Sequence, residues 1–225
     1  MNQGDYEMKK MRMPGAILVL FAILLSGCGK SKVPKDIRES TLVIDSNSRV
    51  TAYLVEEFDK NYYNLSELTT MAQMQAAEFA GVQFVSVENV QDDNSRVVIN
   101  YQFDETDSYE KFTGDELFYG TVAEVIQQGY DSGISMLSVK DGSILTTEKL
   151  LQKLGQHFII YYPIPVKPEE VKLNPESEEH RQISIYCPEA VEYVSQGAVV
   201  NQDGSITISW VLGNDYIPVY ILLKK

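Results

Sequence analysis

Short apolar runs joined by tight turns recur along the chain and restrict the kind of sheet that it can form. The run TLVID (41–45) is followed by the turn residues SNS and then by RVTAYLVEEF (49–58). A second pair of runs, VQFVSVENV (82–90) and SRVVINYQF (95–103), is separated by QDDN, a group of turn formers. Strands that are joined by so few residues are antiparallel, so both pairs are predicted hairpins.

Helical patterns alternate with these hairpins in the first half. The stretch 64–81 begins with Asn, has Glu three residues later and ends in Gly, with apolar residues at helical spacing between them. The stretch 113–129 repeats this arrangement with Thr, Glu and Gly. Both resemble a capping box followed by a helix that stops at a glycine.

The second half is richer in strands. Asp141-Gly142 lies between two apolar runs and is a strong hairpin signal. Thr146 is expected to cap a short helix over residues 147–154. Further strands are predicted at 157–162, 182–187, 190–195, 205–212 and 216–223. The predicted class is therefore α+β, with antiparallel hairpins, two or three helices and a strand-rich C-terminal half.

Individual residues in these strands carry finer expectations. Alternation places Trp210 on an apolar face of its strand, so this ring is predicted to lie in the core. Pro218 lacks an N–H group and would suit an edge strand. The proline-rich, acidic connection over 163–181 is expected to lie on the surface.

The N-terminal segment contains an oily stretch, GAILVLFAILLSGCGKSK (15–32). Its densely apolar part, residues 16–25, is shorter than the roughly 20 residues that a membrane-spanning helix needs, and it has the length of a signal-peptide core. The basic residues within 9–12 supply the positive charge that precedes such a core. Because residues 1–7 carry acidic side chains instead, we expect the natural start to be Met8.

Leu25, Ser26, Gly27 and Cys28 resemble the lipobox of bacterial lipoproteins, in which Leu, a small residue and Gly or Ala precede a Cys. The resemblance covers residues 8–28. It implies that the Cys28 thiol carries diacylglycerol and that a dedicated signal peptidase cuts before this residue. Two acyl chains suffice for stable anchoring, whereas a single chain binds only marginally. The alternative interpretation is a buried cysteine that follows an uncleaved anchor.

This resemblance implies an organisation in three parts. Residues 1–27 would be the signal peptide, 28–40 a lipidated basic tether, and 41–225 an extracytoplasmic α+β domain. A division into two subdomains, if there is one, is expected near 130–135. The implied location is the cell membrane, on its extracytoplasmic face, and the implied partners are the bilayer and the lipoprotein-processing enzymes.

The charge pattern agrees with an anchored domain that faces outward. Residues 29–40 carry a net charge of +2, whereas residues 41–225 carry a net charge of −16. Basic residues are attracted to an anionic leaflet and acidic ones are repelled from it. The domain also lacks a Lys/Arg cluster that would neutralise phosphates, so a nucleic-acid partner is not expected.

Motifs for catalysis or for metal binding are nearly absent. The chain has no nucleophile elbow, no HExxH and no phosphate-binding glycine loop. His157 and His180 have no neighbouring ligand at metal spacing, and the acidic turns at 92–94 and 104–107 lack the EF-hand pattern. We therefore predict neither a metal nor a cofactor. Ser108 and Lys111 match the S-x-x-K pattern of penicillin-interacting enzymes, but the second element of that family is missing, which favours a chance match.

Cysteine and tyrosine add two further observations. If Cys28 is lipidated, Cys187 is the remaining cysteine, and the mature chain has no intramolecular disulfide. The pairs Tyr62-Tyr63 and Tyr161-Tyr162 could stack on sugars or contact a partner protein, but tyrosine also suits strands. If these segments are extended, at least one ring of each pair should face outward.

Three functions remain open on this basis. The first, which we favour, is a non-catalytic binding or structural role with an envelope protein or a glycan as partner. The second is a cell-envelope hydrolase that uses a carboxylate pair, which sequence spacing alone cannot show. The third, a solute receptor of a transporter, fits poorly because such receptors alternate strands with helices over a longer chain.

Overall fold

The computed structural model describes residues 36–90, 96–129, 135–163, 180–211 and 217–225, and the structural statements below concern these residues. The lipobox with Cys28, the QDDN turn and most of the connection over 163–181 lie outside the described ranges. None of the helices within these ranges has the length and apolar content needed to cross a bilayer.

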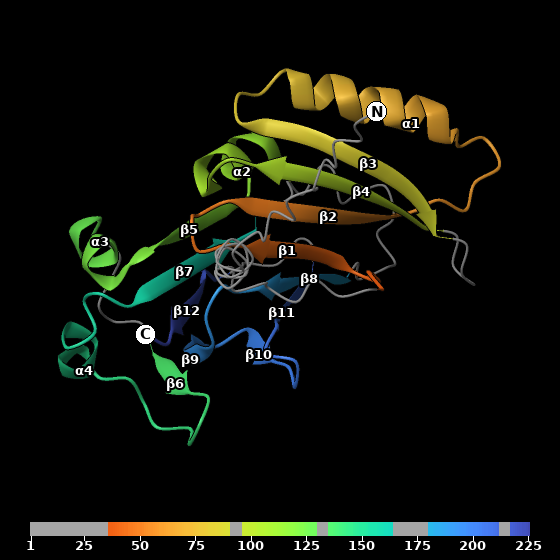
Figure 1. The fold of residues 1–225 in the computed structure, drawn as a ribbon. Helices are drawn as coiled ribbons and strands as arrows, with labels where there is room; N and C mark the ends of the chain where they lie inside the picture. Colours follow the sequence, from red (N-terminus) through yellow and green to blue (C-terminus); the bar gives the residue numbers. More distant parts are fainter. Residues whose placement is uncertain (1–35, 91–95, 130–134, 164–179, 212–216) are drawn as a thin grey trace, which may run out of the picture. The chain divides into compact units, whose positions relative to one another are not determined.

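Two sheets form the framework of the described residues (Figure 1). The larger sheet has the strand order β10-β11-β8-β1-β2-β4-β3, and the smaller one has the order β5-β7-β12-β9-β6. The larger sheet consists of β1 (Ser40–Ile44), β2 (Val50–Glu57), β3 (Val82–Val90), β4 (Arg96–Phe103), β8 (His180–Tyr186), β10 (Ala198–Val200) and β11 (Ile206–Val211). The smaller sheet consists of β5 (Glu116–Thr121), β6 (Met136–Ser138), β7 (His157–Tyr162), β9 (Val191–Ser195) and β12 (Val219–Leu223). The helices in the described ranges are α1 (Leu65–Ala77), α2 (Thr106–Thr113), α3 (Val122–Gln127) and α4 (Thr147–Leu151).

The predicted α+β class is confirmed. Both hairpins of the first half form as expected, with β1 antiparallel to β2 and β3 antiparallel to β4. In the first hairpin the carboxylate of Asp45 accepts hydrogen bonds from the backbone N–H groups of Asn47 and Arg49 at 2.8 and 3.1 Å. This turn chemistry is local, which explains why the sequence predicted it.

Each sheet takes strands from both sides of residues 130–135. In the larger sheet β1 pairs with β8 in parallel, and in the smaller sheet β5 pairs with β7. The subdomain boundary considered near 130–135 falls almost entirely on residues outside the description. The strands on its two sides nevertheless pair with one another in both sheets.

The first predicted helix is confirmed at its start and corrected at its end. The Asn64 side chain accepts hydrogen bonds from the N–H groups of Ser66 and Glu67, so the expected N-cap is present. The helix stops at Ala77, before Gly81. Gly81 instead allows a close approach of α2 to this turn, because a Cβ on residue 81 would lie 2.5 Å from Ser108 Oγ. The φ angle of Gly81, +76°, also favours glycine.

The predicted helix over 113–129 is wrong in its first half. The helix α2 ends at Thr113, Gly114 adopts the left-handed conformation, and the chain then forms strand β5. The helix expected there begins only at Val122, where Thr121 and Glu124 make a full capping box. Core packing decides between the two structures, because alternation in β5 buries Leu117 and Tyr119.

Most predictions for the second half are confirmed, and two need correction. The strands expected near 157–162, 182–187, 190–195, 205–212 and 216–223 all form, and Thr146 caps α4, which is shorter than expected. The short strand β10 was not predicted. Pro218 does not mark an edge strand, because β12 pairs with both β7 and β9, and the proline lies just before the first paired residue.

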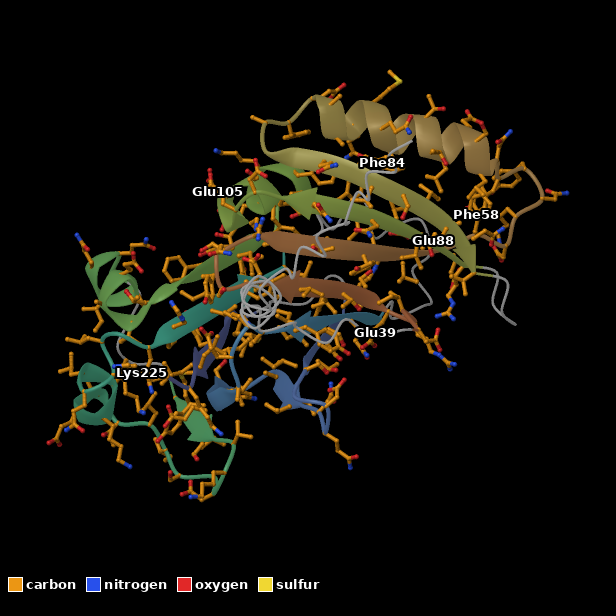
Figure 2. All side chains as sticks on the ribbon, in the orientation of Figure 1. Glu39, Phe58, Phe84, Glu88, Glu105 and Lys225 are labelled. Carbon is orange, nitrogen blue, oxygen red and sulfur yellow. The ribbon has the colours of Figure 1, made fainter. Side chains whose placement is uncertain are left out.

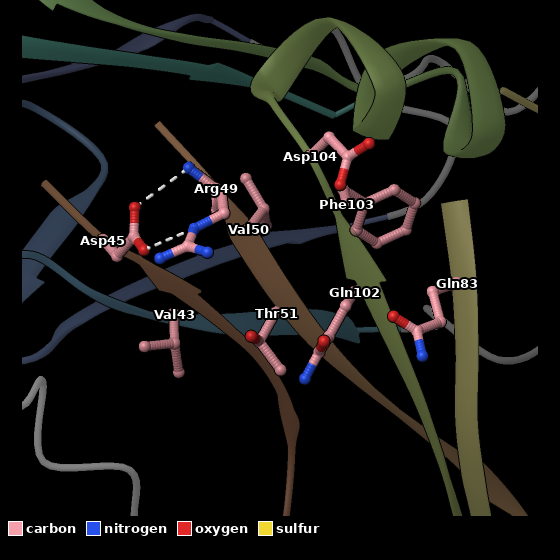
Figure 3. Close-up of a pocket in the computed structure, with 9 residues that line it drawn as sticks. All are labelled: Val43, Asp45, Arg49, Val50, Thr51, Gln83, Gln102, Phe103 and Asp104. Carbon is pink, nitrogen blue, oxygen red and sulfur yellow. Dashed lines mark hydrogen bonds and ion pairs between the residues drawn. The ribbon is translucent and has the colours of Figure 1, made fainter. Parts of the chain in front are cut away.

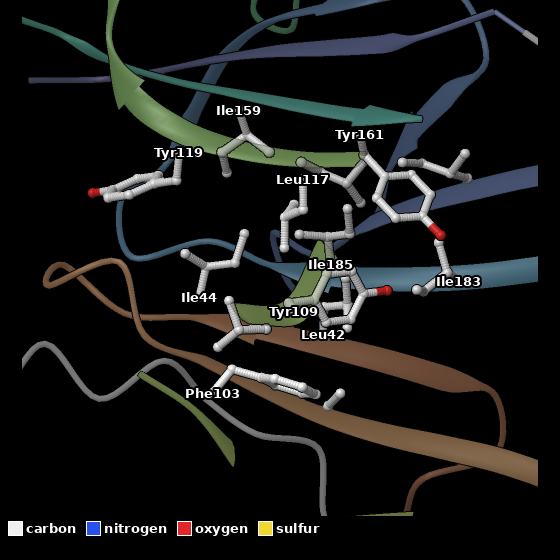
Figure 4. Packing of buried hydrophobic residues seen from close by; sticks show 14 of the residues in the cluster. Leu42, Ile44, Phe103, Tyr109, Leu117, Tyr119, Ile159, Tyr161, Ile183 and Ile185 are labelled. Carbon is white, nitrogen blue, oxygen red and sulfur yellow. The ribbon is translucent and has the colours of Figure 1, made fainter. Parts of the chain in front are cut away.

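The core lies between the two sheets (Figure 4). Leu42 and Ile44 of β1 face Leu117, Ile159 and Tyr161 of the smaller sheet, and all five side chains are buried. The neighbouring residues of β7, Phe158 and Ile160, pack on its other face against Val122 and Val125 of α3. Strand β7 is thus buried on both faces, as its continuous apolar sequence requires.

The helices α1 and α2 cover another part of the larger sheet, around β3 and β4 (Figure 1). Ala72 and Ala76 of α1 and Tyr109 of α2 belong to the same core cluster as Tyr101 and Phe103 of β4. The helices and the smaller sheet therefore contact the same face of the larger sheet.

Candidate functional site

A cleft of about 450 Å³ opens on this shared face of the larger sheet. Its walls come from α1, α2 and the end of β7, and its floor comes from β2, β4, β8 and β11. Aromatic rings dominate the lining, and we call the site the aromatic cleft. Its rings are those of Tyr101, Tyr109, Phe112, Tyr161 and Trp210.

Strand alternation forms the floor of the aromatic cleft. Leu54 of β2 lies opposite Ile99 of β4, and Arg181 of β8 lies opposite Trp210 of β11. The same alternation that buries Ile206 and Ile208 in the core brings Trp210 to the cleft, where it is half-buried. The prediction that Trp210 lies in the core is therefore correct only in part, since this ring packs against the core and also lines the cleft.

Asp115 is the polar centre of the wall. Its Oδ2 atom accepts hydrogen bonds from the hydroxyl groups of Tyr161 at 2.8 Å and Tyr109 at 3.2 Å. Burial, followed by the charge of Asp115, raises the pKa of Tyr109 well above its ordinary range, and burial together with the neighbouring Tyr109 raises that of Tyr161. Both phenols thus stay protonated at neutral pH and act as fixed donors.

Local structure places this carboxylate. The helix α2 ends at Thr113, whose Oγ1 donates to the Tyr109 carbonyl at 2.9 Å and accepts the Asp115 N–H at 3.2 Å. Gly114 turns the chain in the left-handed conformation, with φ of 85°. Asp115 is therefore held between a helix end and a buried strand, which preorganises it for hydrogen bonding.

Trp210 completes the aromatic cleft. The centres of its ring and the Tyr161 ring are 6.3 Å apart, with 54° between the planes. Rings at the side of a cleft with fixed polar groups nearby suit ligands that combine apolar faces with hydroxyl or amide groups, such as sugars and extended peptides.

A second, polar hollow of about 420 Å³ involves the other face of the larger sheet (Figure 3). Thr51, Gln102 and Gln83 lie in register across β2, β4 and β3. Asp45 and Arg49 at its rim form an ion pair of 2.9 Å, which leaves them turned toward each other (Figure 3). These two charges neutralise one another, which leaves Asp104 as the other charged side chain of the lining. With one carboxylate and no unpaired cation in this lining, the hollow is the weaker candidate for binding a charged ligand.

A third hollow, of about 320 Å³, lies beside the start of α1. It is lined by Phe58, Tyr62, Tyr63 and Met71, and we call it the tyrosine hollow. Tyr62 is 73% exposed and Tyr63 is also exposed, but this pair lies in a turn, so the expectation stated for an extended segment does not apply to it. Glu56 and Ile99 line both this hollow and the aromatic cleft, so the two sites adjoin.

The other tyrosine pair lies in strand β7 and differs from the first, in which both rings are exposed. Tyr161 is buried in the core, whereas Tyr162 is only half-buried. Adjacent residues of a strand point to opposite faces, which accounts for the difference.

The remaining candidates from the sequence do not converge on a reactive site. His157 Nδ1 lies 2.9 Å from Glu189 Oε1, and its ring packs on Tyr119 at 4.9 Å. Burial, with the nearby charge of Glu189, raises the pKa of the free Cys187 thiol to about 12, which makes it a poor nucleophile. The described residues contain no group of three or more His, Cys, Asp or Glu side chains placed to hold a metal ion.

The S-x-x-K residues also have structural roles. Lys111 Nζ lies 2.5 Å from Asp107 Oδ2 in an exposed ion pair, and Ser108 is buried against Gly81. The side chain of His180 and the residues Leu25, Ser26, Gly27 and Cys28 lie outside the description.

Sequence reasoning missed the meeting of Tyr109, Asp115 and Tyr161, because a misplaced helix covered the segment around Asp115. For the Tyr161-Tyr162 pair the sequence indicated only that at least one ring would face outward if the segment is extended.

The described fold and cleft define an α+β domain of two sheets with an aromatic cleft. Comparison of the chain with protein-family models, with curated proteins and with solved structures gives no match.

Proposed function

We propose that this chain is a bacterial lipoprotein, anchored through diacylglycerol on Cys28, whose extracytoplasmic domain binds an envelope protein or a glycan without catalysis. The lipobox, Leu25 to Cys28, supports the anchor. The binding role rests on one observation, which is the aromatic cleft with the carboxylate of Asp115 held by two buried phenols.

The contacts at the start of the domain fit a chain that enters from a tether. The Glu39 carboxylate accepts hydrogen bonds from Gln182 and Ser184 of β8, and Arg96 Nη1 donates to the Arg38 carbonyl at 2.6 Å. Glu39 lies beside the start of β1 (Figure 2). These bonds hold the last residues of the basic segment, Arg38 and Glu39, against the larger sheet.

The hydrolase alternative has less support from the geometry. Glu56 and Asp115 both line the aromatic cleft, but Asp115 already accepts hydrogen bonds from two phenols. Among the carboxyl groups of the described residues, the one whose pKa burial raises is Glu110, which accepts the Leu117 N–H at 2.8 Å and is absent from the cleft lining. A general acid would need its raised pKa inside the cleft.

Lipid labelling in a bacterial host tests the anchor. The wild-type chain should incorporate labelled fatty acid and enter the detergent phase, and Cys28→Ala should do neither. Cys187→Ala is the matched control and should label like the wild type. Continued labelling of Cys28→Ala would contradict the proposed anchor.

Fluorescence tests the binding site, because Trp210 is the single tryptophan of the chain and lines the cleft. Titrating the full chain, in nonionic detergent, with cell-wall glycan fragments and with envelope peptides should give a saturable change in emission for one of them. Asp115→Asn should weaken that binding, whereas Gln83→Ala in the polar hollow should not. A ligand that binds by calorimetry but leaves Trp210 emission unchanged would place the binding site elsewhere.

A further inference from the structure

We infer that the tyrosine hollow binds a cationic side chain, a lysine or an arginine, of a partner polypeptide. This goes beyond the proposed function by naming the chemistry of the partner. It depends on the hollow itself and not on the lipid anchor, so the two proposals can fail separately.

The aromatic rings of the hollow are already arranged as walls. The rings of Phe58 and Tyr63 stack with centres 5.1 Å apart and 28° between planes. The Tyr62 ring meets that of Tyr63 edge-on, at 4.9 Å and 75°. Phe58 lies where β2 ends, beside the start of α1 (Figure 2). Ring faces that are fixed in this way attract cations through their quadrupoles.

The charged residues that line the hollow are all acidic, namely Glu56, Glu57 and Glu67. Among the described residues, no Lys or Arg side chain forms a salt bridge with Glu57 or Glu67. Lys60, a nearby cation in the loop before α1, is held by Asp59 at 2.6 Å. Arg96, which lies opposite Glu57 in register, donates to the Arg38 carbonyl at 2.6 Å. The hollow therefore presents negative charge that a partner cation can complement.

The same hollow is unsuited to an anion. The N–H groups of Ser66 and Glu67, which a helix start would otherwise offer, donate to Asn64 Oδ1 at 2.9 and 3.2 Å. With these donors occupied and only carboxylates as charged groups, the lining repels phosphates and carboxylates.

Exposed apolar side chains next to the rings favour a polypeptide over a free cation. Met71, in the lining, is 61% exposed, and Met74, one turn further along α1, is 64% exposed. Methionine is flexible and is frequent at surfaces that accommodate varied peptides. A lysine flanked by apolar residues would engage the glutamates, the rings and these methionines together.

A calorimetric titration of the full chain in nonionic detergent tests this inference. The probe is a blocked peptide of alanine, leucine, lysine, leucine and alanine, and the matched peptide has glutamine in place of lysine. The lysine peptide should bind at least about fivefold more tightly than the glutamine peptide, and this advantage should shrink as salt is raised. Equal affinity of the two peptides would overturn the inference.

Variants locate the binding. Tyr62→Ala and Glu67→Gln should each weaken binding of the lysine peptide at least about threefold. Leu151→Ala and Glu148→Gln are matched controls, because Leu151 is an exposed apolar residue and Glu148 lies in the first turn of α4 as Glu67 does in α1. Equal losses in the controls, or no loss in Tyr62→Ala and Glu67→Gln with cooperative melting retained, would contradict the assignment.

Two further arms identify other occupants. Spermidine that binds in competition with, and more tightly than, the lysine peptide would assign the hollow to a free polyamine. Replacing Lys30, Lys32 and Lys35 with glutamine removes three of the four cations of the chain's own basic segment and leaves Arg38. If that replacement raises peptide affinity more than about threefold, the occupant is this segment. Either result would overturn the commitment to a partner polypeptide.

Discussion

At the scale of the residue, the aromatic cleft depends on one carboxylate and two phenols from distant parts of the sequence. Tyr109 lies in α2 and Asp115 lies just after the end of this helix, so these two residues are close in the sequence. Tyr161 lies 46 positions after Asp115. No local signal links them, since their meeting depends on β7 pairing with β5. The contribution of these three side chains to the stability of the fold can therefore be measured by substitution.

The hydroxyl of Tyr161 is expected to contribute measurably to stability. Tyr161→Phe leaves the half-buried Asp115 carboxylate with one phenol fewer and should cost about 1–3 kcal/mol in the free energy of unfolding. Urea unfolding measures this cost. Tyr162→Phe is the control, because this neighbour is only half-buried, and its change should stay within about 0.5 kcal/mol. Equal effects of the two substitutions would contradict the assigned role of Tyr161.

The contact between Gly81 and Ser108 makes a second prediction at this scale. Gly81 and Gly129 both have positive φ, at 76° and 79°, but only at Gly81 would a Cβ meet another atom. Gly129→Ala should cost about 1 kcal/mol for the backbone conformation alone. Gly81→Ala should cost at least about 1 kcal/mol more, because the new Cβ would lie 2.5 Å from Ser108 Oγ.

A double substitution checks the cause of that difference. Adding Ser108→Ala to Gly81→Ala removes the Oγ atom and should recover much of the extra loss seen in thermal or urea unfolding. If the double variant is as unstable as the sum of the two single ones, the contact does not explain the cost.

At the scale of the element, caps and alternation decide where helices and strands begin. The segment 113–121 could have continued as a helix by its own pattern, but β5 forms because it buries Leu117 and Tyr119 between the sheets. The capping box at Thr121 then starts α3 at the first position where the strand has ended. The sequence predicted a helix with its cap at Thr113. Packing of β5 moves the start of the helix to the capping box at Thr121.

This capping box makes stability depend on pH. The backbone N–H and the hydroxyl of Thr121 donate to Glu124 Oε2 at 2.6 and 2.8 Å, and these bonds lower the pKa of Glu124. A lowered pKa means that the stabilisation is complete above the ordinary Glu pKa of about 4.3 and is lost as pH falls through the folded value. Glu124→Gln keeps an acceptor at the box but does not titrate.

Urea unfolding at several pH values measures this effect. The stability difference between the wild type and Glu124→Gln should favour the wild type at about pH 6 and shrink as pH falls toward about 3. Glu148→Gln, at the start of α4, is the control for general charge effects. A difference that stays constant over this range would contradict the role assigned to the Glu124 carboxylate.

At the scale of the whole molecule, both sheets are completed only by strands from the two halves of the chain. Strand β1 pairs with β2 on one side and with β8 on the other, and β5, which precedes residue 130, pairs with β7, which follows residue 135. The described core is apolar and contains no disulfide or metal cluster within the described residues. We therefore expect folding of the domain to depend on burial of side chains between the sheets.

Removal of metal tests this expectation. The full chain in nonionic detergent should melt cooperatively, and the midpoint should stay the same, within about 1 °C, after treatment with a chelator. A second melt with added calcium should also be unchanged, because the acidic turns lack a full set of ligands. Loss of the cooperative transition in chelator would show that a metal supports the fold.

Tight turns, helix caps and strand alternation could be predicted before the structure, because each depends on residues close together in the chain. Features of this kind are the hairpins at 41–58 and 82–103, the N-cap at Asn64 and the strand at 157–162. The parallel pairing of β1 with β8, the strand β5 and the aromatic cleft were decided by tertiary structure. The physical reason is that these features depend on how much surface distant segments bury together, and a local pattern does not contain that quantity.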